Sequence, residues 1–171
     1  ALGDSCAGVY SGLSQRAPLS TAVAAATMAV ETGADTLVGV GGSTVSDASR
    51  MIAVMIAEGI KSEAQLRSLG EEHQGTLSPD LVGKQLPYQV SIPTTLSAGE
   101  FNTGGGNVLD DRAGHKIRVR NPALFAHLIV LDPELTEGTP DWLWLSTGVK
   151  AMDHCIERLY SAGNQPAIDA P

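Results

Sequence analysis

The stretch Val38-Gly39-Val40-Gly41-Gly42-Ser43-Thr44-Val45-Ser46-Asp47 decides the fold of this 171-residue chain. Residues 36–40 form an apolar run typical of a strand buried on both faces, and after the glycines apolar residues recur at helical spacing up to Gly59. At such a junction, unpaired N–H groups and the positive end of the helix dipole point at one spot, and glycine has no Cβ to keep an anion away. We therefore expect a pyrophosphate here, although a plain turn capped by Ser43 or Thr44 remains an alternative.

Helices and strands alternate on both sides of this junction. An alanine-rich helix is predicted to begin at Pro18 and to end before Gly33. The other predicted elements are a helix at 63–69, a polar connector at 70–87, a strand at 89–92, a hairpin through 110–114, a buried strand at 127–131 and a long helix at 140–161. The order predicts an α/β domain with a mostly parallel sheet over residues 1–138, and the first helix of a second unit over residues 139–171.

Composition excludes several classes of protein. With 43% hydrophobic and 18% charged residues the chain is typical of a globular domain. A net charge of -8 argues against nucleic acid as a partner, since such binding needs clustered Lys and Arg. The longest apolar run, residues 51–57, is too short to span a membrane. Two cysteines, Cys6 and Cys155, fit a reducing compartment, so we expect a cytoplasmic protein, and the start at Ala1 suggests a piece of a longer chain.

A second group of polar residues follows the strand at 89–92. In Ser91-Ile92-Pro93-Thr94-Thr95-Leu96-Ser97-Ala98-Gly99-Glu100-Phe101-Asn102, hydroxyls and small side chains come directly after the carboxyl end of the strand. Ligands of open α/β sheets bind along that edge. The alternative is a Ser/Thr turn whose side chains bond to the local backbone.

Four motifs give the chain a specific resemblance. They are Gly41-Gly42-Ser43-Thr44 with Asp47, Pro93-Thr94-Thr95 with Glu100, Asp132-Pro133-Glu134-Leu135, and Gly148 with Ala151, His154 and Glu157. In this order and spacing they resemble the iron-containing alcohol dehydrogenase family. The short loop after Thr95, and His154-Cys155-Ile156-Glu157 followed by Leu159-Tyr160, are similar to its maleylacetate reductase-like branch.

The resemblance implies a Rossmann-like dinucleotide-binding domain followed by an all-helical domain. It implies an NAD(P)-dependent oxidoreductase that transfers hydride to or from a small alcohol, ketone or keto acid, with a homodimer as the family's common assembly. By that comparison the chain lacks the first strand of the nucleotide domain and nearly all of the helical domain. Two alternatives stay open: a dehydroquinate synthase-like lyase and an inactive nucleotide-binding fragment.

The resemblance also implies roles for individual residues. Gly41, Gly42, Ser43 and Thr44 would hold the pyrophosphate, Asp47 the nucleotide end of that loop, and Thr94, Thr95 and Ser97 the ribose and nicotinamide side. Lys116 would lie near the nucleotide phosphates, although a solvated hairpin lysine is an equal alternative. Two departures stand out. Ser43 occupies a position that is glycine in the family and could limit how close the phosphate comes, and Arg50 replaces a lysine.

The metal site is where the sequence departs most from the family. Iron-type members use an aspartate four residues before a histidine on the long helix. Here the histidine is His154 and the aspartate position holds Lys150. An ammonium has no lone pair and repels a nearby cation by about 4 kcal/mol at an effective dielectric of 20.

We therefore expect a divalent metal (Fe or Zn) to be absent or bound atypically, with His154 as its one candidate ligand here. Lys150 and His154 would then act as electrophile and proton donor on the substrate carbonyl. The alternative is a Lys150 that pairs with Asp153 or Glu157 on the helix surface.

Overall fold

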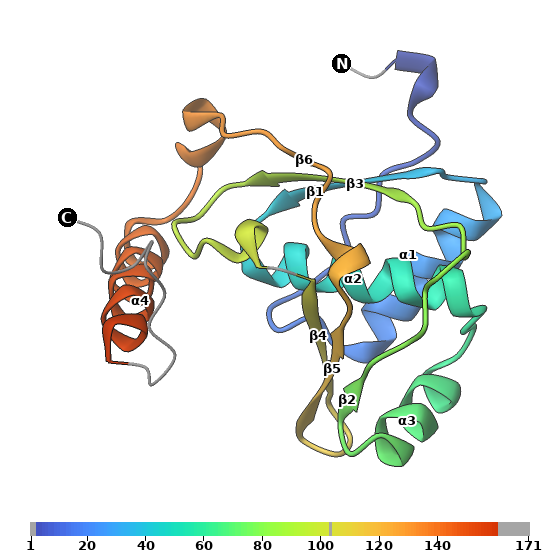
Figure 1. The fold of residues 1–171 in the computed structure, drawn as a ribbon. Coiled ribbons are helices and arrows are strands. Elements are labelled where there is room, and N and C mark those ends of the chain that lie inside the picture. The colour runs from blue at the N-terminus through green and yellow to red at the C-terminus, as the bar shows by residue number, and fades with distance from the viewer. Residues whose placement is uncertain (1–2, 103, 161–171) are drawn as a thin grey trace.

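The computed structural model describes residues 3–102 and 104–160, and these contain four α-helices and two three-stranded sheets (Figure 1). The helices are α1 (Leu19–Glu31), α2 (Ser43–Glu58), α3 (Glu63–Glu72) and α4 (Asp141–Leu159). The strands are β1 (Thr36–Gly41), β2 (Thr76–Leu77), β3 (Tyr88–Pro93), β4 (Gly105–Asp110), β5 (His115–Arg120) and β6 (Leu128–Ile129).

The two sheets differ in strand direction. One is wholly parallel, in the order β1-β3-β6, and pairs Gly41 with Pro93 at its carboxyl edge. In the other, of order β2-β5-β4, β4 and β5 form an antiparallel hairpin and β2 runs parallel to β5. Helices α1 and α2 lie between the sheets (Figure 1). The α/β class with a parallel sheet is confirmed, while the predicted hairpin at 110–114 belongs to a sheet of its own.

Helix α2 has an apolar face and a polar face. Its buried Met51, Val54 and Met55 pack in one core with residues of α1 and of the β4–β5 hairpin, such as Val108 and Ile117. This burial of apolar area is what holds the helices against the hairpin.

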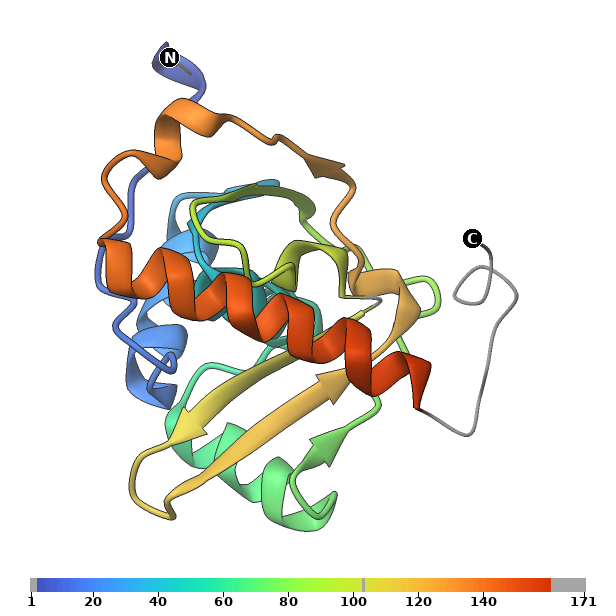
Figure 2. The ribbon, with the colours of Figure 1, turned by 90° about the vertical axis from the view of Figure 1, so that its left-hand side faces the viewer.

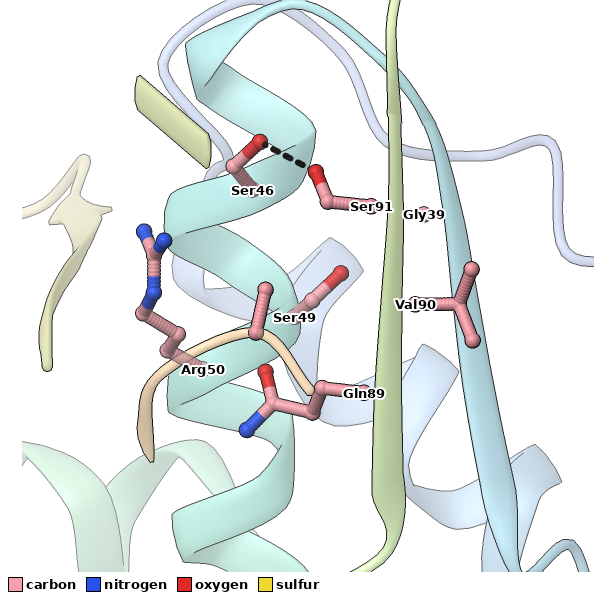
Figure 3. Close-up of a pocket in the computed structure, with 8 residues that line it drawn as sticks. Gly39, Ser46, Ser49, Arg50, Gln89, Val90 and Ser91 are labelled. Carbon is pink, nitrogen blue, oxygen red and sulfur yellow. Dashed lines mark hydrogen bonds between the residues drawn. The ribbon is translucent and has the colours of Figure 1, made fainter. Parts of the chain in front are cut away.

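The contact of α2 with the parallel sheet is polar instead. Gln89 and Ser91 point from β3 towards α2, whereas Val90 points to the opposite face (Figure 3). Ser91 shares a hydrogen bond of 3.3 Å with Ser46 of α2.

Two expectations of burial are wrong: that the strand at 36–40 is buried on both faces, and that the strand at 127–131 is buried. The side chains of Val38 and Val40 are 41% and 52% exposed, and Leu128 and Leu131 are also exposed. Successive residues of a strand point to opposite faces. The face of β1 turned towards α2 carries the glycines, including Gly39, so its valines point to the other face.

The predicted helices agree closely with the observed ones. Helix α1 begins directly after Pro18 and is followed by Gly33, which has the left-handed φ of 64° that ends many helices. Helix α4 begins at Asp141. The predicted end of this helix at residue 161 lies outside the described residues, and the domain boundary at residue 138 stays a prediction. Within the described part of the chain, no helix has the length and hydrophobicity needed to cross a membrane.

Candidate functional site

The turn between β1 and α2 has the open helix start that the sequence predicts. Gly41 has a φ of 152°, and a Cβ on it would lie 2.6 Å from Cγ2 of Val45, so the position requires glycine. The carbonyl of Gly42 accepts the N–H groups of Val45 and Ser46 at 3.0 and 3.3 Å. No side chain in the described part of the chain caps the helix at Gly42. The first turn of α2 therefore keeps its positive end free of a protein partner.

A cavity of about 150 Å³ opens beside this helix start. Eight residues line it: Gln15, Arg16, Ala17, Ser43, Thr44, Asp47, Asn107 and Lys116. Four of the residues predicted for cofactor binding, from α2 and from β5, thus meet at one cavity. The arrangement places hydroxyls, two cationic side chains and the helix N-terminus around the same space, which favours an anionic ligand.

Asp47 is the acidic member of this cavity. The amide of Asn107 donates a hydrogen bond to its Oδ2, and Nη1 of Arg50 lies 3.5 Å from its Oδ1. Burial raises the pKa of Asp47 above its ordinary value, and the charges of Arg50 and Lys116 and the Asn107 bond oppose that effect. The carboxylate is thus held in place by α2 and β4 together.

The loop after β3 packs over the glycine turn and does not line the cavity. The N–H of Thr94 donates to the carbonyl of Gly41 at 3.1 Å. The side chain of Thr95 is so close to Gly42 that a Cβ there would lie 3.0 Å from it, and the hydroxyls of Thr95 and Ser97 are 2.9 Å apart. The two motifs adjoin because β1 and β3 are parallel neighbours whose carboxyl ends share an edge.

Four of the residues that line the cavity were not predicted: Gln15, Arg16, Ala17 and Asn107. Nor was the role of Arg50, which is buried and lies 3.5 Å from Asp47. The sequence marked Arg50 only as a replacement for lysine, three residues after Asp47. No local pattern indicates Asn107, because a strand pairing and a long-range packing contact bring it to Asp47.

Lys150 and His154 lie apart from the cavity, on α4, and both are exposed. Lys150 Nζ forms an ion pair with Asp153 Oδ2 at 2.5 Å. This bond raises the pKa of Lys150 and lowers that of Asp153. The surface pair that the sequence left as an alternative is therefore present.

Helix α4 is nevertheless held beside the loop that follows β3 (Figure 2). The hydroxyl of Thr139 donates to the carbonyl of Thr94 at 2.8 Å, and that of Thr147 accepts the N–H of Leu96 at 3.2 Å. The residues that carry the loop motif and those that carry the α4 motif thus belong to one connected region.

A metal site does not form from the described side chains. Among residues 3–102 and 104–160, no three His, Cys, Asp or Glu side chains lie close enough together to hold an ion. His154 supplies one nitrogen, and its neighbour one turn earlier, Lys150, supplies a cation. The donors present do not fit a divalent metal.

Comparison with known proteins agrees with this architecture. The chain matches the family model described as iron-containing alcohol dehydrogenase over residues 1–133. It is 33% identical over 163 residues to dehydrogenase ALT3 of Alternaria alternata, a match covering 95% of this chain and 41% of that protein. The crystal structure of maleylacetate reductase from Agrobacterium tumefaciens aligns with a TM-score of 0.69 at 25% identity, covering 97% of this chain and 38% of that one.

The fold recurs in a protein solved with a nucleotide. Sulfoacetaldehyde reductase from Bifidobacterium kashiwanohense in complex with NAD+ aligns with a TM-score of 0.79 at 23% identity, over 95% of this chain and 40% of that one. The chain therefore spans about two fifths of the length of these proteins, which are oxidoreductases by name. The family match covers most of the chain and includes the glycine turn, the loop after β3 and the residues that line the cavity. The chain belongs to the iron-containing alcohol dehydrogenase family.

Proposed function

We propose that this chain is the dinucleotide-binding part of an NAD(P)-dependent oxidoreductase acting on a small alcohol, ketone or keto acid. The observation that carries the proposal is the uncapped N-terminus of α2, which opens beside a polar cavity lined by Ser43, Thr44 and Lys116. Backbone N–H groups, hydroxyls and an ammonium around one space are suited to a diphosphate.

The size of the cavity indicates which part of the ligand it takes. Pockets that enclose a whole small-molecule ligand measure about 300–1,000 Å³. This cavity measures about 150 Å³, so it is large enough for only part of a dinucleotide, and its hydroxyls and cations suit the diphosphate. Thr95 and Ser97, whose hydroxyls adjoin the glycine turn, would contact the nicotinamide side.

The bound nicotinamide ring would supply or accept the hydride. In this proposal His154 gives a proton to the substrate oxygen or takes one from it, and Lys150 stabilises negative charge on that oxygen. Lys150 is paired with Asp153 on the exposed surface of α4, so this role requires the ammonium to exchange that partner for the substrate oxygen. No metal-dependent step is included, because the described side chains do not provide a metal's ligands.

Nucleotide binding is the first test. The purified protein is titrated with NADH and with NADPH while nucleotide fluorescence is followed. Lys116→Ala removes a cation from the cavity and should weaken binding by ~10-fold, a value typical of one charge-assisted contact. Lys84→Ala is the matched control, because Lys84 pairs with Glu58 away from the cavity. If the wild type binds neither nucleotide, or if the two variants bind equally well, the proposal is wrong.

Hydride transfer is the second test. The full-length enzyme is assayed by the absorbance of NAD(P)H with a panel of aldehydes and keto acids, with and without added divalent metal. Lys150→Ala and His154→Ala should each lower kcat, and the His154 variant should also lose the pH dependence of turnover. Unchanged turnover of Lys150→Ala without metal would remove that residue from the mechanism.

A further inference from the structure

Arg50 is a buried cation beside the candidate site. It lies on α2 with only 2% of its side chain exposed, and its Nη1 is 3.5 Å from Oδ1 of Asp47, which lines the cavity. A buried guanidinium is unfavourable unless its N–H groups are bonded, so its partners show what its burial achieves.

The partners are backbone carbonyls from two other segments. Nη2 donates to the carbonyls of Gly99 and Glu100 at 2.9 and 3.2 Å, and Nη1 donates to that of Gly105 at 3.1 Å. Gly99 and Glu100 begin a short turn (Gly99–Phe101) after the β3 loop, and Gly105 is the first residue of β4. One side chain thus ties a loop and a strand to the same helix.

A lysine would not reproduce these bonds. The guanidinium is a planar fork with five donors in fixed directions, whereas an ammonium is a point charge with three donors on one atom. Here the two terminal nitrogens serve carbonyls on different segments, which a single nitrogen at the end of a lysine side chain would not reach together.

Both segments lead directly to residues of the nucleotide site. Gly99 packs against Ser43, the first residue of α2, because a Cβ built on Gly99 would lie 2.8 Å from the Cβ of Ser43. Two residues before it in the chain is Ser97, which is bonded to Thr95. On the other side, Gly105 is two residues before Asn107, the partner of Asp47. Gly106 is pressed against α2, since a Cβ on it would lie 2.6 Å from the carbonyl of Asp47.

We infer that Arg50 is a positioning residue of the dinucleotide site. Its guanidinium holds the Gly99–Phe101 turn and the start of β4 against α2, and so sets the places of the Thr95–Ser97 pair and the Asn107–Asp47 pair. That the ligand is a dinucleotide rests on the proposed function. The effect of Arg50 on the Gly99–Phe101 turn and on the start of β4 does not depend on the ligand.

The test compares Arg50→Lys with Met55→Ala. Met55 is buried in the same helix but on its apolar side, in the core shared with the hairpin, so its truncation lowers stability while the three carbonyl bonds of Arg50 stay in place. Circular dichroism and thermal unfolding establish that each variant is folded at the assay temperature. Arg50→Gln, which keeps one amide donor, takes the place of Arg50→Lys if the latter does not fold.

The first measurement is amide hydrogen exchange in the nucleotide-free protein. Arg50→Lys should speed exchange over residues 99–102 and 104–106 by at least ~10-fold relative to Met55→Ala, because local opening no longer breaks the three carbonyl bonds. Equal exchange in the two variants over this segment overturns the inference.

The second measurement is binding of NADH and of ADP. ADP contains the diphosphate but lacks the nicotinamide half. Both segments are displaced in Arg50→Lys, so both nucleotides should bind more weakly than they bind to Met55→Ala. NADH should lose ~10-fold or more, because it uses the Thr95–Ser97 pair as well as the Asn107–Asp47 pair, and ADP a smaller factor, since small misplacements are costly at a preorganised site. If Arg50→Lys binds both nucleotides as tightly as Met55→Ala does, the inference is overturned. If wild-type protein binds neither nucleotide, the proposed function fails, and the exchange result alone decides whether Arg50 positions the two segments.

Discussion

Replacing Gly41 with alanine should destabilise the protein through two separable effects. The residue has a φ of 152°, and a Cβ built on it would lie 2.6 Å from Cγ2 of Val45 and 3.2 Å from its Cβ. The backbone conformation costs a residue other than glycine about 1–3 kcal/mol. Moving Val45 off its preferred helical rotamer adds about 0.5–1.5 kcal/mol, because a β-branched side chain in a helix has one strongly favoured χ1.

The expected loss is therefore roughly 1.5–4.5 kcal/mol, the sum of the backbone and rotamer costs. For a chain of this size, each kcal/mol lowers Tm by about 2–4 °C, so the midpoint should fall by roughly 3–18 °C. Thermal and urea unfolding followed by circular dichroism measure the change, and the urea slope shows whether the transition stays two-state.

Two further variants separate the effects. Gly114 also has a positive φ, of 73°, but a Cβ on it would meet no atom within 4 Å, so Gly114→Ala carries only the backbone cost of about 1–2 kcal/mol. Val45→Ala combined with Gly41→Ala should recover the part due to the clash, as a double-mutant cycle measures. If Gly41→Ala costs no more than Gly114→Ala and shows no coupling to Val45, the reasoning about this turn is refuted.

Three other outcomes follow from buried polar groups. Asp110 is fully buried and accepts hydrogen bonds from Arg67, which lower its pKa. The ionised carboxylate therefore stabilises the fold above its ordinary pKa of 3.8, and this stability is lost as the pH falls through the lower pKa of the folded state. Asp110→Asn should reduce the dependence of unfolding stability on pH between about pH 2 and 5. Burial raises the pKa of Asp47, so ionisation of this carboxyl group lowers stability as the pH rises above 3.8. Asp47→Asn should therefore raise Tm at pH 7 and leave it unchanged at pH 3. A lower Tm of this variant at pH 7 would contradict the argument. Among the described residues, Nε2 of Gln89 is a buried donor without a hydrogen-bond partner. Gln89→Met should therefore leave the free energy of unfolding in urea unchanged or raise it by about 1 kcal/mol. A clear loss of stability would show that the amide does have a hydrogen-bond partner.

Local patterns were sufficient for the order of elements and for the centre of the site. The apolar run before Gly41 and the helical spacing after Ser43 predicted β1 and α2, and the observed bounds differ from the predicted ones by one or two residues. The uncapped start of α2 also agrees with prediction, because it depends on residues adjacent in the chain. Strand β2, at Thr76–Leu77, was missed because two residues in a polar connector carry no periodicity.

Exposure was predicted less well than secondary structure. The apolar run that contains Val38 and Val40 was interpreted as buried on both faces, whereas these two valines are exposed. An apolar sequence shows which residues favour burial, but not which element lies over each face of a sheet. The polar contact of Ser46 with Ser91 was missed for the same reason.

The candidate site divides in a similar way. Sequence motifs indicated Ser43, Thr44, Asp47 and Lys116, and the structure places all four on one cavity. They did not indicate that Arg50 connects three segments, because its acceptors are backbone carbonyls about 50 residues along the chain, which have no side-chain signature.

From sequence alone, the chain's α/β class, its glycine turn and its family resemblance could be determined, since each depends on residue types at short and regular spacings. Tertiary structure decided the separate hairpin sheet, the exposed valines, the ion pair of Lys150 and the burial of Arg50. The physical reason is that hydrogen bonds and packing between distant segments depend on where the backbone goes. A backbone carbonyl is chemically the same in every sequence, and an apolar strand face does not show which element covers it, so only the neighbours in space give either of them a role.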